Sequence, residues 1–231
     1  MKKITALLLC MCMLLAVSLA TAATMPDQPQ VNMADMFKMI EALTRQPQTQ
    51  PVVLRGDAIP AHIRAIMPGE LEDGSYTDYG MGEISFHAES RIKRSEADTA
   101  SFEFRCVAKK PEIAGPLLPM VKAQLQEEIK EKADELRAQG KKPAYIANPA
   151  ELGGDFALKR IHKSVEMPWG VIYTQEVTDS YNGKIRIRVS ASFIGLVELT
   201  QFGGSVSGVE SEAQALEFIN NVAGIAAGAG K

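Results

Sequence analysis

Two short segments concentrate the basic side chains of this 231-residue chain, Lys159, Arg160, His162 and Lys163 in one and Arg186 and Arg188 in the other. If the two segments pair, they form a cationic patch able to receive an acidic ligand or an acidic partner protein. Alternatively, Glu89, Glu103 and Glu176 on facing strands neutralise them, each exposed ion pair contributing about 0.5 kcal/mol. Because these two segments concentrate the basic side chains of the chain, the patch is the best candidate binding site that the sequence offers.

The chain has three histidines, His62, His87 and His162, and none has the close spacing to another ligand that a zinc site usually requires. The sequence therefore predicts no metal and no other cofactor. His87 is the most interesting of them, because it lies between Ser85 and Glu89 on the solvated side of a predicted strand, where a carboxylate would make it pH-sensitive.

Cys106 and Trp169 each have two interpretations. The strand pattern around Cys106 points its thiol inward beside Phe102 and Phe104, where a thiol is inert, so packing is favoured over a nucleophile or a redox thiol. Trp169, the single tryptophan, lies in a loop between two predicted strands, where it either covers the edge of the core or marks a recognition point. We include Trp169 and His87 among the candidate binding residues.

Residues 1–22 have the three regions of a cleavable secretory signal peptide: two lysines, an apolar run over residues 7–16, and small residues ending at Ala22. The apolar run is too short to span a bilayer, which needs about 20 residues, so no transmembrane anchor is expected after cleavage. The sequence predicts an exported protein, periplasmic or secreted.

Cleavage after Ala22 would leave 23 of the 25 basic residues against all 28 acidic ones, a net charge of −5. We expect no nucleic-acid partner, because phosphate binding needs a basic surface and this net charge is negative. Two of the three cysteines would leave with the signal, so Cys106 would have no intramolecular partner. The fold must then be stabilised by a packed core and not by disulfides.

After the signal, residues 23–50 are predicted to form a short helix and a proline- and glutamine-rich spacer, and residues 51–231 a single domain. Glycine and proline interrupt residues 51–81, which are predicted to be irregular apart from a helical turn or two over residues 61–67. Apolar and polar residues then alternate over 84–93 and 102–109, the pattern of a hairpin with one solvated face.

A helix is predicted from Pro116 to Gly140, with one apolar stripe. Strands are expected over 156–165 and 171–178. Asn182-Gly183 is a strong hairpin signal that leads into a strand over 185–193, followed by a turn near Gly195 and a strand over 196–202. Ser207 and Glu210 fit a capping box that would open a last helix. These patterns predict an α+β fold: an antiparallel sheet of about five to six strands packed against a long central helix and a C-terminal helix.

This order of elements resembles the fold of the PsbP family of photosystem II extrinsic proteins and their exported bacterial relatives. The resemblance depends on residues 171–226, with the strands that lead into Ser207-Gly208-Val209-Glu210 and the last helix. It implies a non-catalytic accessory or binding domain.

Residues and resemblance together predict an exported, non-enzymatic domain of the cell envelope that binds an envelope partner protein or a small ligand. One alternative is a hydrolase or metal-dependent enzyme whose site is assembled from distant residues, such as His87, Glu89 and an acid from residues 151–155. The other is a carrier of a hydrophobic ligand, with the long helix lying over a pocket in the sheet.

Overall fold

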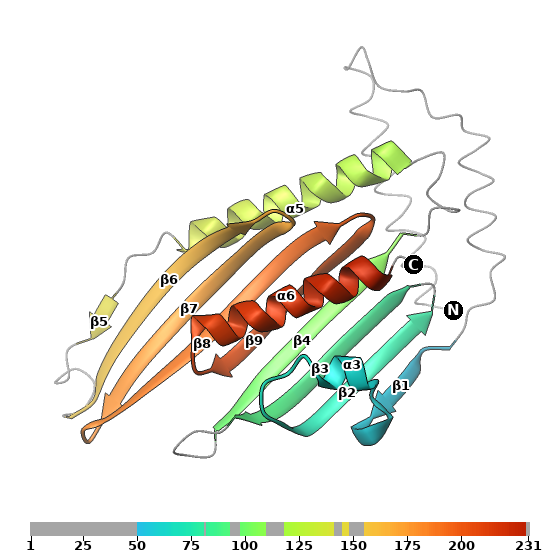
Figure 1. Cartoon of the computed structure of the whole chain (residues 1–231). Coiled ribbons are helices and arrows are strands. Elements are labelled where there is room, and N and C mark those ends of the chain that lie inside the picture. The colour runs from blue at the N-terminus through green and yellow to red at the C-terminus, as the bar shows by residue number, and fades with distance from the viewer. Residues whose placement is uncertain are drawn as a thin grey trace, which may run out of the picture. The chain divides into compact units, whose positions relative to one another are not determined.

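A single antiparallel sheet organises the part of the chain that the computed structural model describes, residues 50–80, 82–92, 98–109, 118–140, 145–147 and 155–229. The sheet has nine strands in the order β1-β2-β3-β4-β9-β8-β7-β6-β5 (Figure 1). The predicted signal peptide lies outside the described residues, as does the predicted helix and spacer over 23–50 apart from Gln50.

The strands are β1 (Val52–Arg55), β2 (Glu70–Gly80), β3 (Glu83–Ile92), β4 (Asp98–Ala108), β5 (Tyr145–Ala147), β6 (Ala157–Met167), β7 (Gly170–Tyr181), β8 (Lys184–Val197) and β9 (Thr200–Val209). The helical elements are the short turn η1 (Gly56–Ala58), α3 (Ala61–Arg64), α5 (Leu118–Gly140) and α6 (Glu212–Ala229). The predicted α+β class, the antiparallel sheet, the long central helix and the C-terminal helix are confirmed.

The two long helices lie on opposite faces of the sheet. Val171 packs with Ala133 and Leu136 of α5, whereas its neighbour Ile172 belongs to the main core with the buried side of α6. Successive strand residues point to opposite faces, so we call these the α5 face and the α6 face. Figure 1 shows α6 and the short α3 in front of the strands.

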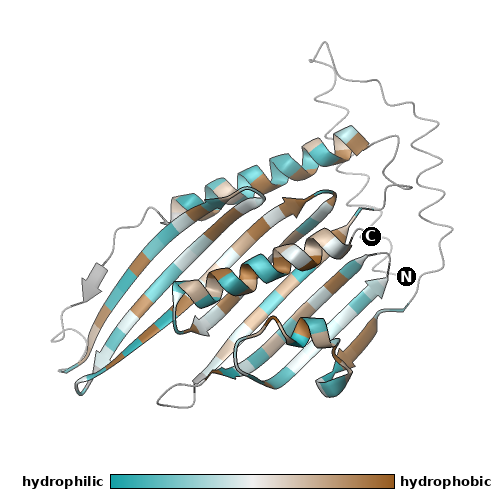
Figure 2. Cartoon of the chain, in the orientation of Figure 1, coloured by the Kyte–Doolittle hydropathy of each residue, from teal (hydrophilic) through white to brown (hydrophobic). Residues whose placement is uncertain are grey.

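The main core lies between α6 and the middle strands. Phe218 of α6 is fully buried, and its ring lies 5.0 Å from that of Phe102 and 6.4 Å from those of Phe104 and Phe193. Alternation of hydrophobic and hydrophilic residues along the strands is visible in Figure 2. One side of each middle strand is thus buried under α6, as the period of two predicts.

The predicted strand number is wrong, mainly because residues 51–81 are not irregular. They hold β1, η1, α3 and the eleven-residue β2. Gly74 was taken to interrupt this stretch, but it is buried within β2, and a Cβ there would lie 3.1 Å from Leu71 and 3.3 Å from Ala88. A glycine that makes room for packing cannot be distinguished by sequence from one that breaks a strand.

Two predicted boundaries in the C-terminal half are also wrong. No turn occurs at Gly195, which lies inside β8, where a Cβ would lie 2.5 Å from the Trp169 ring. The chain turns instead at Glu198, whose φ is 52°. The capping box is one turn later than predicted: Ser211 Oγ accepts a hydrogen bond from the Gln214 backbone N–H at 3.3 Å.

The hairpin predicted at Asn182-Gly183 is confirmed, with φ values of 48° and 75°. The strand that follows it alternates as predicted, and Val189 is buried on the α6 face. Ile185 and Ile187, however, are 71% and 45% exposed and do not contribute to the core. Their strand segment extends beyond the part of the sheet that α6 covers.

Cys106 is fully buried, as predicted, and burial raises the pKa of its thiol to about 12. Because only the thiolate reacts, the folded protein lacking residues 1–22 should resist a disulfide reagent at pH 8, and unfolding in urea should release one reactive thiol per chain. A thiol titration with and without urea measures this. Complete labelling of the folded protein within minutes would contradict the burial.

Candidate functional site

The three arginines of the predicted patch lie together on the α5 face. β6 and β8 both pair with β7, and the register places Arg160 and Arg188 on either side of Val177. Arg186 lies two residues before Arg188 on β8 and therefore points to the same face. We call Arg160, Arg186 and Arg188 the arginine face. The pairing that the sequence left open is therefore made through β7, the strand between the two basic segments.

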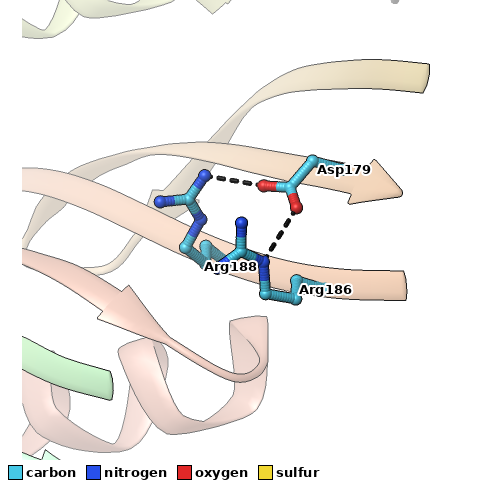
Figure 3. A network of polar contacts seen from close by, with 3 residues as sticks. All are labelled: Asp179, Arg186 and Arg188. Atoms are coloured by element: carbon cyan, nitrogen blue, oxygen red, sulfur yellow. Dashed lines mark hydrogen bonds and ion pairs between the residues drawn. The ribbon is translucent and has the colours of Figure 1, made fainter. Parts of the chain in front are cut away.

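A buried carboxylate holds two of these arginines. Asp179 of β7 is 2% exposed, and its Oδ1 accepts a hydrogen bond from Arg186 Nε at 3.1 Å. Its Oδ2 accepts from Arg188 Nη2 at 2.7 Å (Figure 3). The arginine side chains are 45% and 48% exposed. Asp179 thus fixes the orientation of both guanidinium groups, and about half of each arginine side chain stays exposed.

The cluster itself holds three guanidinium groups and one carboxylate. Asp179 binds two of the arginines, and Arg160, one strand away from Asp179, is exposed on the same face. Of the acids expected to neutralise the patch, Glu176 lies on the α6 face of β7 and Glu103 lies beside His87 on β3. An acidic group could therefore meet the arginines from the solvent side.

Sequence reasoning missed Asp179, although a signal for it was present. A two-residue hairpin loop at Asn182-Gly183 sets the register of the strands that it joins, so that Tyr181 meets Lys184 and Asp179 meets Arg186. Counting outward from the turn would have placed this carboxylate opposite the arginine.

The lysines of the predicted patch lie on the other face. Lys159 and Lys163 of β6 alternate with Arg160 and His162, so they point to the α6 face. Lys163 Nζ donates to Glu212 Oε2 of α6 at 2.7 Å, and this hydrogen bond is the main cause that raises the pKa of Lys163. Lys163 thus ties β6 to the first turn of α6.

His162 shares the α5 face with the arginines but is half-buried, with its Nδ1 in contact with the Tyr173 hydroxyl. Burial raises the pKa of Tyr173, whose ring packs with the core beneath α5. His162 therefore lies in the packing between the sheet and α5.

Trp169 lies in the turn between β6 and β7, and its ring is 5.0 Å from that of Phe202 on the α6 face. Seven residues of β6 separate Arg160 from Met167 at that turn, about 23 Å at roughly 3.3 Å per residue. Trp169 and the arginine face therefore cannot contact one small ligand together.

His87 lies in a separate groove on the α5 face, over β2, β3, β4 and β9. The groove has a volume of about 290 Å³. Its lining includes Ser75, Ser85, His87, Glu103, Arg105 and Gly203. His87 Nδ1 lies 3.8 Å from Glu103 Oε2, and both side chains are more than half exposed. Arg105 forms an ion pair with Glu83. Glu103 is thus the acid beside His87, whereas the predicted enzymatic site had Glu89 in that place. Residues 151–154, which were expected to supply a further acid of that site, lie outside the described residues.

An unexpected apolar feature adjoins the arginine face. Ile185 and Ile187 alternate with Arg186 and Arg188 along β8 and point to the α6 face. The first pair in the register of β8 with β9 is Val189 with Val209. Over residues 184–188, β8 therefore pairs with β7 on one side, and no described strand lies on the other.

The fold and the site together define an α+β domain whose antiparallel sheet carries the arginine face. Within the described ranges, no group of three histidine, cysteine, aspartate or glutamate side chains is placed to hold a metal ion. Neither α5 nor α6, nor any other helix of those ranges, is long and apolar enough to cross a membrane. No protein-family model, curated protein or solved structure matches the chain. The resemblance to the PsbP family therefore stays a prediction.

Proposed function

We propose that this chain is an exported, non-enzymatic domain of the cell envelope that binds an acidic partner protein through the arginine face. The observation that carries the proposal is the buried Asp179, which holds Arg186 and Arg188 side by side while 45% and 48% of their side chains stay exposed. Two guanidinium groups fixed in this way lose less side-chain entropy when they bind a carboxylate than two free ones would.

The arginine face is favoured over the His87 groove because the charges of the groove are already matched. His87 lies beside Glu103, and Arg105 forms an ion pair with Glu83. An acidic partner gains less from such a balanced surface than from one with an excess of positive charge.

The part of the proposal that concerns export is supported by residues 1–22, whose basic, apolar and small-residue regions follow the order of a secretory signal. Amino-terminal sequencing of the protein recovered from its own cells should give a chain that begins at Ala23, outside the cytoplasm. An uncleaved chain in the cytoplasm would contradict the proposed location.

Binding can be tested with a fluorescein-labelled peptide of glutamate residues, titrated with the protein that lacks residues 1–22 and followed by anisotropy. Arg160→Gln and Arg188→Gln should each weaken binding by about 5-fold, since each removes one charge from the surface that the peptide meets. The matched control is Arg55→Gln, an exposed arginine of β1 at the far edge of the sheet. Equal weakening by Arg55→Gln, or no binding by the unaltered protein, would overturn the proposal.

A further inference from the structure

The groove around His87 is open to solvent. It lies on the α5 face over β2, β3, β4 and β9, whereas α5 itself contacts β6, β7 and β8. Within the groove the side chains of His87, Glu103 and Arg105 are each more than half exposed. A small ligand can therefore reach this part of the sheet directly.

The side chains that line the groove can all form hydrogen bonds. The strand register places His87 between Ser75 on one side and Glu103 on the other. It also places Ser85 opposite Arg105. Two neighbouring rows across the strands thus bring together two hydroxyls, an imidazole, a carboxylate and a guanidinium on one face.

The floor between these side chains is main chain. Phe86 and Phe104 also line the groove, but their side chains are buried in the main core, and Gly203 has no side chain. An aromatic ring lies next to the groove: Tyr79 is 39% exposed, and the Arg105 guanidinium lies 5.9 Å from its ring centroid. The surface that a ligand would meet is thus polar, with a ring close by.

The charges of the groove favour a neutral ligand. Its lining holds one carboxylate, Glu103, and one guanidinium, Arg105, and Arg105 also forms an ion pair with Glu83. An anion would lie near two carboxylates and a cation near a guanidinium, so neither sign of charge gains much here. Charged groups nevertheless form stronger hydrogen bonds with a neutral partner than neutral groups do.

We infer that this groove binds a neutral ligand rich in hydroxyl groups, a single sugar ring, at a second site beyond the proposed function of the arginine face. A sugar hydroxyl both donates and accepts, so it can donate to Glu103 and accept from Arg105. Ser75 and Ser85 can rotate their hydroxyls to suit either role. The volume of about 290 Å³ is close to the lower limit of small-molecule sites, about 300 Å³, which suits one ring.

Two other classes of ligand fit the groove less well. A hydrophobic ligand would remove water from His87, Glu103 and Arg105 without replacing its hydrogen bonds, which costs free energy. An acidic peptide would meet the carboxylates of Glu103 and Glu83. A neutral sugar avoids both costs.

The test is a titration of the protein lacking residues 1–22, followed by NMR of the histidine rings. The probes are methyl β-D-glucopyranoside, methyl β-D-galactopyranoside and N-acetylglucosamine. At least one of them should shift the His87 imidazole resonances with a dissociation constant of about 1 mM, as expected for a small ligand in an open site. His62 is the internal control, because α3 packs against the main core on the α6 face, and its resonances should not move.

Cyclohexanol is the matched control ligand, since it has a six-membered ring but a single hydroxyl. It should leave the His87 resonances unchanged at the concentrations at which the sugar binds. Equal binding of cyclohexanol would show that the groove selects an apolar ring, and it would overturn the inference.

Matched variants locate the site. Glu103→Gln keeps the shape of the side chain but replaces a charged acceptor, and it should weaken sugar binding about 5-fold. Glu89→Gln is the control, because Glu89 lies two residues from His87 on the same face of β3 but outside the lining of the groove. Urea unfolding of both variants establishes that they fold. Equal weakening by the two substitutions would overturn the assignment to this groove.

The outcomes are separate from those for the arginine face. Absence of His87 shifts with all three sugars would overturn this inference and leave the binding of the glutamate peptide unaffected. Glucuronate, a sugar ring with a carboxylate, should bind about 5-fold more weakly than the neutral sugar, because it would lie near Glu103 and Glu83. Tighter binding of glucuronate that Arg188→Gln abolishes would place the sugar on the arginine face and overturn the inference.

Discussion

Replacing Asp179 with asparagine is expected to lower the free energy of unfolding by about 2–3 kcal/mol. The substitution keeps the shape of the side chain but removes the buried charge that accepts hydrogen bonds from Arg186 and Arg188. The amide nitrogen of asparagine cannot accept, so at least one guanidinium loses its inner partner. The two arginines also lose the carboxylate that lies between them. Urea unfolding at pH 7, followed by circular dichroism, measures the change.

The matched control for Asp179 is Asp134→Asn. Asp134 also accepts a hydrogen bond from an arginine, Arg137 on α5, at 2.7 Å, but its side chain is 62% exposed. An exposed pair of this kind contributes about 0.5 kcal/mol or less, so Asp134→Asn should be nearly neutral. Equal effects of the two substitutions would show that burial of Asp179 adds nothing to its pairing. The Asp179→Asn variant should also bind the glutamate peptide more weakly than the unaltered protein, because Arg186 and Arg188 are no longer held in place.

Gly204→Ala is expected to destabilise the protein by about 2–3 kcal/mol. Gly204 of β9 pairs with Phe104 of β4, and a Cβ at this position would lie 2.1 Å from the Glu103 carbonyl oxygen. That neighbour is main chain, so the contact can be relieved only by moving one strand away from the other. The pairing of β4 with β9 joins β1–β4 to β5–β9, and the substitution therefore weakens the connection between the two halves of the sheet.

Gly224→Ala makes the same chemical change where space is open. Gly224 lies inside α6 and has no atom within 4 Å of an added Cβ. Alanine favours a helix interior over glycine by about 1 kcal/mol, so this variant should be more stable than the unaltered protein. Opposite signs for the two glycine substitutions in urea unfolding are the expected result. Neutrality of Gly204→Ala would show that β4 and β9 approach less closely than the structure has them.

The pattern of residue types alone predicted the strands in which apolar and polar residues alternate without interruption. It placed Phe102, Phe104 and Cys106 on one buried side of β4, because a period of two allows only one set of side chains to face the core. It also determined the hairpin at Asn182-Gly183, since few residue pairs accept positive φ twice. Both features are local, and the backbone geometry of a few consecutive residues suffices to specify them.

Which apolar faces are covered depends on tertiary packing. The alternation from Ile185 to Phe193 is uniform, yet Val189 and Phe193 are buried whereas Ile185 and Ile187 are exposed. The difference arises because α6 contacts β9, β8 and β4, and β9 stops pairing with β8 at Val189. A strand pattern contains no information on how far a helix from another part of the chain will reach along it.

The same limit applies to the site. The sequence predicted that Arg160, Arg186 and Arg188 would lie together, because two basic segments of one sheet could be neighbours. It also grouped Lys159, Lys163, Trp169 and His87 with them, and the structure separates these by face, by distance along β6 or by strand. The buried carboxylate that orders the arginines came from register, a relation between strands that composition does not express. Register and helix coverage are properties of the packed sheet, and they determine which of the charged residues can act together.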